Sequence, residues 1–360
     1  PSKASVFVMF RHGQPSSLAQ AIRSVSRNRK RLLVAGDRQT PPRIQILSAT
    51  YGVPDQPEHA RDVSAIIQRL VADGQTVFPV TALAAVGGDP DHGVVKTLNL
   101  HYRINGKEIH RQLDGGELVD LTGCSANPPV AIEAGPKGGI QLFLTQPGRY
   151  RCALASGKTV MFTVPSIPRP ITLQGPWTVK FPSGWGAPDQ VQLDKLIAWN
   201  RHPDAGVRFF SGTASYHAEF DVPASLLTGR HRLDLDLGAV AVMAGVTLND
   251  RPLGILWKPP FRVDATSVLR AGRNTLEIAV ANLWINRMIG DQQLPADSDR
   301  ARDGHLLRWP QWLLEGKPSP TGRFTFTTWE LWHKTDPLVE SGLIGPVRLL
   351  TAVCKPLVSL

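Results

Sequence analysis

Alternating apolar and polar residues recur along most of this chain and predict strands. Residues 98–104 alternate in this way before Asn105-Gly106, a pattern typical of a half-buried strand that enters a two-residue turn of type I′. Residues 62–73 have helical spacing, with Asp62 as a candidate N-cap and Gly74 at the end. A parallel β/α barrel needs repeated helices of about 10–15 residues, so the sequence predicts an all-β fold with one short helix.

Further strands are predicted wherever the same pattern returns between Gly, Pro, Asn and Asp. They lie at 118–121, 140–144, 150–154, 160–164, 209–210, 216–220, 233–237, 246–248, 276–280, 324–326 and 347–349. Many short strands with such punctuation indicate sandwiches or jelly rolls. We therefore predict two β-sandwich domains: residues 1–165 with the helix, a Pro-rich linker at 166–170, and a second domain at 171–354.

Composition and charge exclude several classes of protein. The chain has 360 residues and 42% hydrophobic residues, enough for ordinary buried cores rather than disorder. The net charge of +10 is scattered, and its one cluster, residues 27–31, is interpreted as a solvated hairpin tip, so no nucleic-acid partner is expected. The apolar run 5–10 is too short for a signal peptide or membrane span. Because the chain opens with Pro1, we expect it to be part of a longer polypeptide.

Cysteine and histidine give no sign of a metal centre or cofactor. Cys124, Cys152 and Cys354 are odd in number and lack CxxC spacing, so they encode neither a disulfide framework nor a thiolate site. A single disulfide between Cys124 and Cys152 stays open. Four histidines are too dispersed to suggest a metal site: His202, His217, His305 and His333. We expect no metal and no cofactor.

All nine tryptophans lie between Trp177 and Trp332. Tryptophan combined with Asn, Arg and Asp is suited to sugar, because rings stack on C–H faces and polar groups bond hydroxyls. Trp257, Trp329 and Trp332 are candidate stacking platforms, with core packing as the alternative. Trp177 is assigned to the core, and so is Trp284.

The strongest polar constellation is formed by Asn282, Asn286, Arg287 and Asp291, which follow a predicted strand. Donors and acceptors so close in sequence can meet several hydroxyl groups at once, so these residues are candidate carbohydrate contacts. A structural alternative stays open: Arg287 and Asp291 clamp a loop, and the Asn side chains satisfy backbone groups. From residue 287 to 322 the sequence is irregular, and excursions of this length are usually functional or disordered.

Several motifs resemble known families. Those at 175–177, 211–216, 248–254, 260–264 and 272–276 resemble the sugar-binding, galactose-binding-like β-sandwich of family 2 glycoside hydrolases. Trp257-Lys258-Pro259-Pro260 and the segments 282–291 and 341–347 are similar to the C-terminal region of family 106 glycoside hydrolases, the α-L-rhamnosidase-like enzymes. This second resemblance covers roughly residues 170–352. Residues 49–52, 62–64, 89–90 and 95–98 look like a small domain at the end of certain J-domain proteins, which indicates a shared scaffold.

The resemblance to family 106 implies that the catalytic carboxylates and the metal of the enzyme belong to a barrel domain N-terminal to this chain. It also implies a secreted or periplasmic location, a carbohydrate ligand and the barrel as a partner. Glycoside hydrolysis normally needs two carboxyl groups, and the irregular segment supplies Asp291, Asp297, Asp299, Asp303, Glu315 and Glu330. Solvated loop carboxylates are commoner than catalytic ones, so we expect no catalytic residues here.

The predicted function is therefore that of a non-catalytic C-terminal part of a glycoside hydrolase, which supports the catalytic barrel and contributes to carbohydrate binding. Two alternatives stay open. One is a free-standing carbohydrate-binding module. The other is an interaction scaffold without glycan affinity, for which the net charge predicts salt-sensitive binding to an acidic partner.

Overall fold

The computed structural model describes residues 22–34, 43–53, 56–80, 83, 96–114, 118–121, 128–134 and 139–357. Antiparallel strands dominate these ranges and the helices are short, so the predicted all-β sandwich-type fold is confirmed. None of the helices described has the length and apolar character needed to span a membrane. Three separate groups of buried apolar side chains form the cores.

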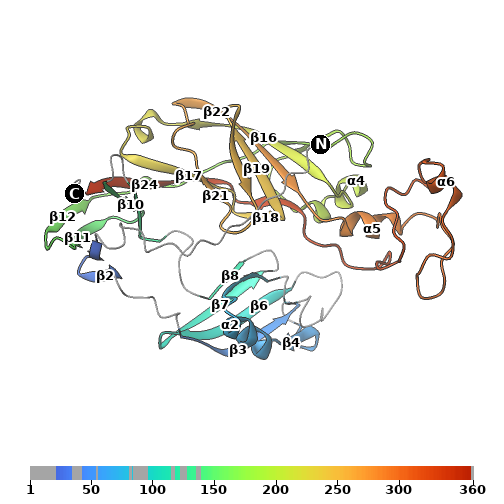
Figure 1. Cartoon of the computed structure of the whole chain (residues 1–360), viewed down its shortest axis with the longest axis horizontal. Helices are drawn as coiled ribbons and strands as arrows, with labels where there is room; N and C mark the ends of the chain where they lie inside the picture. Colours follow the sequence, from blue (N-terminus) through green and yellow to red (C-terminus); the bar gives the residue numbers. More distant parts are fainter. Residues whose placement is uncertain are drawn as a thin grey trace.

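The strands β4, β3, β6 and β7, labelled in Figure 1, form a four-stranded sheet in that order, and side chains of this sheet contribute to the first core. Its elements are β3 (Ile44–Gly52), η1 (Pro57–His59), β4 (Ala60–Asp62), α2 (Ser64–Ala72), β6 (Thr97–Ile104) and β7 (Lys107–Asp114), with a two-stranded sheet of β5 (Val77–Pro79) and β8 (Leu118–Asp120). The predicted turn at Asn105-Gly106 has positive φ at both residues, as type I′ requires. Asp62 accepts a hydrogen bond from the backbone N–H of Ser64 at 2.7 Å but lies one residue before the N-cap, Val63.

The second core joins segments far apart in sequence. Its four-stranded sheet contains β1 (Ile22–Arg27), β2 (Lys30–Val34), β11 (Gly148–Leu154) and β12 (Thr159–Val164). Because β1 pairs with β11, the first core is inserted between them in the chain. The basic cluster at 27–31 forms the exposed turn between β1 and β2, as predicted. Cys152 is a free, buried thiol on β11, whereas Cys124 lies outside the described residues.

The third core fills a sandwich of two six-stranded sheets, ordered β15-β14-β16-β22-β19-β20 and β21-β17-β24-β10-β9, with β13 paired to β24. The elements not yet given are β9 (Val130–Ala134), β10 (Ile140–Leu144), β13 (Ile171–Thr172), β14 (Trp177–Lys180), β15 (Gln190–Leu193), η3 (Trp199–Arg201), α4 (Ala205–Arg208), β16 (Thr213–Val222), η4 (Ala224–Leu226), β17 (His231–Asp236), β18 (Ala239–Ala241), β19 (Met243–Leu248), β20 (Arg251–Leu256), β21 (Arg262–Asp264), β22 (Gly272–Ala281), β23 (Gly342–Gly345) and β24 (Arg348–Leu357). β24 also carries Leu357 into the second core, so the two cores share a sheet.

Two predicted strands are wrong. Residues 209–210 follow α4, whose first turn is capped by the Asp204 carboxylate accepting from the N–H of Val207 at 3.1 Å. Residues 324–326 form no strand, because the carboxylate of Asp291 binds two of the backbone N–H groups that a sheet would need.

The irregular segment between β22 and β23, residues 282–341, contains two short helices, α5 (Ile285–Asp291) and α6 (Gln311–Leu314). We call this segment the excursion. In Figure 1 it extends from one end of the sandwich, while β11 and β12 lie at the opposite end. The excursion therefore presents a surface of its own.

Candidate functional site

An ion pair on α5 holds the base of the excursion. Arg287 and Asp291 lie one helical turn apart, with Nε of the arginine 3.1 Å from Oδ1 of the aspartate. Both side chains are buried, and burial lowers the pKa of Arg287. Oδ2 of Asp291 accepts hydrogen bonds from the N–H of Phe324 at 2.9 Å and from the N–H and Oγ1–H of Thr325, each at 2.7 Å. This carboxylate thus ties α5 to the far side of the excursion.

The guanidinium group of Arg287 lies close to two aromatic rings. Its Cζ is 5.9 Å from the centre of the Phe209 ring and 4.9 Å from that of Phe324, within reach of cation–π attraction. The backbone N–H of Arg287 donates to Oγ of Ser211 at 3.2 Å. Arg287 therefore positions Phe324 as well as pairing with Asp291.

The two predicted asparagines bind backbone groups. Asn282 accepts from the N–H of Gly212 at 2.8 Å and donates to the carbonyl of Phe210 at 2.9 Å. Asn286 donates to the carbonyl of Val339 at 2.7 Å and accepts from its N–H at 2.8 Å. The structural alternative is thus observed for Asn282, Asn286, Arg287 and Asp291, and sugar contact by these four side chains stays a prediction.

Asp291 and Trp332 line one small cavity of about 20 Å³, together with Asp297, Arg300 and Glu330. A cavity that holds one water needs roughly 10–15 Å³ on this measure. The cavity has room for a water molecule and not for a sugar ring.

A larger hollow lies beside the Arg287–Asp291 ion pair. Its volume is about 510 Å³, within the roughly 300–1,000 Å³ of small-molecule sites. Four aromatic side chains line it, one from the loop after β14 and three from the excursion: Trp185, Trp312, Phe324 and Phe326. We call this hollow the aromatic groove.

The rings of the aromatic groove support one another. Trp185 stacks on Phe324 with centroids 6.5 Å apart, and Trp284 meets Trp185 edge-on at 5.8 Å. Trp312 meets Phe326 edge-on at 5.9 Å. A Cβ atom at Gly186, where φ is +85°, would lie 3.0 Å from Cζ of Phe324, so the close approach of this loop requires glycine.

Several polar groups of the aromatic groove are already engaged by the protein. Trp312 Nε1 donates to the carbonyl of Asp297 at 2.9 Å, and Ser319 Oγ donates to Oδ2 of Asp297 at 2.7 Å. Arg323 Nε donates to the carbonyl of Pro295 at 2.9 Å. What the groove offers a ligand is therefore chiefly the faces and edges of its rings.

The three predicted platforms, Trp257, Trp329 and Trp332, do not line this groove. Trp257 follows β20, is 62% exposed and has Nζ of Lys258 5.3 Å from its ring centre. Trp329 is 48% exposed beside His305. Trp177 is buried in the sandwich core as predicted, but Trp284 is 49% exposed, so its assignment to the core was wrong: it follows β22 and packs against the exposed loop of Trp185.

Sequence reasoning missed Trp185, Trp312, Phe324 and Phe326. Trp185 had one usable signal, since it stands between Gly184 and Gly186 outside any strand pattern. A bulky aromatic flanked by two glycines of positive φ sits on a turn rather than in a core strand.

The six carboxylates considered for catalysis have partners within the excursion. Asp291 pairs with Arg287, Asp297 accepts from Ser319, and the remaining pairs are Asp299 with Arg308, Asp303 with His305, Glu315 with Lys317 and Glu330 with Arg300. The ion pairs and hydrogen bonds of these groups give no reason to assign an acid–base role.

One group of potential metal ligands occurs in the described part of the chain, and it lies in the first core. It consists of His101, Glu108 and His110 on β6 and β7. The histidines considered from the sequence, His202, His217, His305 and His333, do not belong to it.

Comparison with known proteins places this chain beside glycoside hydrolases. No family model matches the chain. A protein of Formosa agariphila named "Putative beta-glucuronidase" is 36% identical over 349 residues, which cover 94% of this chain and 29% of that protein. The chain is therefore related in sequence to a glycoside hydrolase along nearly all of its length, and it spans 29% of the length of this relative.

Two solved structures show weaker likeness. A rhamnosidase from Novosphingobium sp. PP1Y is 24% identical, with a TM-score of 0.41 over 70% of this chain and 27% of its own. The β-glucuronidase of Bifidobacterium dentium is 23% identical, with a TM-score of 0.34 over 51% of this chain and 30% of its own. At TM-scores this low, neither likeness supports a conclusion about function.

Proposed function

We propose that this chain is a non-catalytic, carbohydrate-binding part of an α-L-rhamnosidase-like glycoside hydrolase and corresponds to the C-terminal region of family 106 enzymes. The sequence relation to a named β-glucuronidase supports the hydrolase assignment. The motifs at 257–260, 282–291 and 341–347 support the finer one. A secreted or periplasmic location fits this proposal and rests on the resemblance alone.

The observation that carries carbohydrate binding is the aromatic groove. Sugars present flat C–H faces, and aromatic side chains are the groups that stack on them. Trp185 and Phe324 are 38% and 39% exposed although they pack against each other. Because neighbouring polar groups are engaged by the protein, ring stacking is the main attraction available to a sugar there. Trp257 and Trp329 are proposed as further platforms.

Support of a catalytic barrel is proposed from a different set of residues. Four leucines of the excursion are at least half exposed: Leu283, Leu307, Leu314 and Leu331. Exposed aliphatic side chains are suited to contact with another protein surface, and they lack the flat ring that favours sugar. We propose that the barrel of the same polypeptide covers them.

The test is a glycan-array screen of the 360-residue chain, followed by calorimetry on rhamnose-containing oligosaccharides and a hydrolysis assay on the same samples. The proposal predicts binding without turnover. Turnover would overturn the non-catalytic assignment. Neither binding nor turnover would favour the interaction scaffold, which should then bind an acidic partner in a salt-sensitive way.

A further inference from the structure

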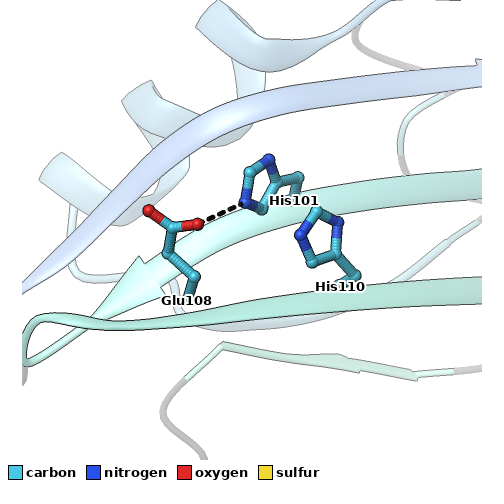
Figure 2. A group of neighbouring side chains, drawn as sticks. All are labelled: His101, Glu108 and His110. Atoms are coloured by element: carbon cyan, nitrogen blue, oxygen red, sulfur yellow. Dashed lines mark hydrogen bonds and ion pairs between the residues drawn. The ribbon is translucent and has the colours of Figure 1, made fainter.

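The outer face of the β6–β7 hairpin brings two histidines together. His101 and His110 are direct partners across the two strands, and their rings stack with centroids 3.7 Å apart and an interplanar angle of 17°. Figure 2 shows both rings on one face of the hairpin. Two neutral imidazoles held this close offer two nitrogen ligands to one ion.

Glu108 completes the group. It precedes His110 by two residues on β7, so its side chain lies on the same face. Its Oε2 is 3.4 Å from Nε2 of His101, as Figure 2 shows. One ligand atom from each of His101, Glu108 and His110 lies within 4.8 Å of the other two. Metal–nitrogen and metal–oxygen bonds to zinc are about 2.0–2.2 Å, so binding one ion requires the stacked rings to rotate until the three ligand atoms converge on it.

The scaffold beneath these side chains is fixed by packing. The opposite face of β6 carries Leu98, Leu100 and Tyr102, all buried in the first core. The turn at Asn105-Gly106 sets the register of the two strands. The ligands therefore stand on a rigid hairpin, the kind of support that a precise site needs.

Arg103 orients the carboxylate. Its Nη2 pairs with Oε1 of Glu108, and its Nη1 donates to Oε1 of Gln45 at 3.3 Å. Ligating carboxylates are commonly hydrogen-bonded in this way, and Oε2 is left facing the histidines. The positive charge of Arg103 opposes a bound cation, so a site of moderate affinity is expected.

We propose that His101, Glu108 and His110 form a binding site for a divalent transition-metal ion of the Zn²⁺ class, with a fourth position open to water or another ligand. Imidazole nitrogen and carboxylate oxygen are the ligands that zinc takes in sites with three protein ligands and a water. The site is separate from the aromatic groove and does not rest on the proposed function.

The test is calorimetric titration of the full chain with ZnCl₂. Wild-type protein should bind one Zn²⁺, and His101→Ala, Glu108→Gln and His110→Ala should each weaken binding about 10-fold or more. His305→Ala is the matched control, because His305 is also a solvent-accessible histidine beside a carboxylate, with its Nδ1 2.5 Å from Oδ1 of Asp303. The absence of a saturable site, or an equal loss in His305→Ala, would overturn the proposal.

A spectroscopic readout separates ligation from any effect on folding. Electron paramagnetic resonance of the wild-type chain with one equivalent of Cu²⁺ should show two nitrogen ligands, and His110→Ala should show one. Fewer than two nitrogens in the wild-type spectrum would contradict the site even if every variant folds.

Discussion

Cys152 and Glu340 show how burial changes the chemistry of single side chains. Burial raises the pKa of Cys152 to about 11. Burial also raises the pKa of Glu340, and the charge of Arg201 opposes this in part. In both cases the low-dielectric surroundings disfavour the charged form. We therefore expect the Cys152 thiol to react slowly, and we expect ionisation of the Glu340 carboxyl group to lower the stability of the fold.

Cys152 should react slowly with thiol reagents in the folded protein. The thiolate is the reactive form, and with a pKa near 11 its fraction at pH 8 is roughly 100-fold below that of an ordinary cysteine. In a Cys124→Ser/Cys354→Ser variant, reaction with Ellman's reagent should be at least that much slower in buffer than in urea. Equal rates would contradict the buried position.

The same reagent tests the disulfide that the sequence left open. Because Cys152 is free in the structure, the wild-type chain should titrate three thiols in urea without reductant. Recovery of a single thiol would show that one disulfide has formed, and peptide mapping would show whether it joins Cys124 to Cys152.

Glu340→Gln should stabilise the fold at neutral pH. A folded-state pKa above the unfolded value of about 4.3 means that the folded state favours the protonated carboxyl. The associated stability is complete below the unfolded pKa and is lost as pH rises through the folded one. In urea unfolding at pH 7, the variant should have a larger free energy of unfolding than the wild-type protein. This gap in unfolding free energy should close below about pH 4.3. Glu219→Gln, at an exposed site, is the control, and a gap of the same size there would contradict the account.

At the scale of elements, α5 and the β6–β7 hairpin differ in how much the sequence predicts. Asn105-Gly106 fixes the turn and so makes His101 and His110 partners, a pairing that is readable from sequence because it is local. α5 is only seven residues long and contains several polar residues, so the sequence pattern did not predict a helix there. The alternation at 324–326 predicted a strand, but the Asp291 carboxylate, 33 residues away in sequence, binds the backbone there. The residues around 324–326 give no sign of this distant hydrogen bond.

Asp291→Ala should destabilise the sandwich strongly. The change leaves two backbone N–H groups without their acceptor and the Arg287 guanidinium buried without its counter-charge. Breaking a buried ion pair from one side costs roughly 3–5 kcal/mol. Asp299→Ala is the control, because its pair with Arg308 is exposed and is worth about 0–1 kcal/mol. Equal losses of unfolding free energy in the two variants would show that the buried Arg287–Asp291 ion pair does not stabilise the fold more than an exposed pair does.

At the scale of the whole molecule, the strands follow from local patterns but their assembly does not. β1 pairs with β11 across the inserted first core, and Trp185 meets Phe324 from a distant loop. No short-range pattern encodes either contact, because each depends on how separate elements pack. This explains why the candidate platforms were chosen by residue type and the aromatic groove was not foreseen.

Trp257→Ala should weaken glycan binding while the melting temperature stays nearly unchanged. The ring is 62% exposed, and substitutions at such surface positions usually change stability by less than about 0.5 kcal/mol. Differential scanning calorimetry and a glycan titration of the same variant check both parts. A fall of many degrees with unchanged binding would assign Trp257 to packing instead.

The most direct test of carbohydrate binding by the aromatic groove is a calorimetric titration of Trp185→Ala beside wild-type protein, with the tightest oligosaccharide from the array. Loss of one stacking ring worth about 1.5 kcal/mol should raise the dissociation constant about 10-fold. Ile255→Ala, which removes an exposed apolar side chain from β20, should leave it unchanged. An unchanged constant in Trp185→Ala, with the variant folded, would contradict a sugar site in the aromatic groove.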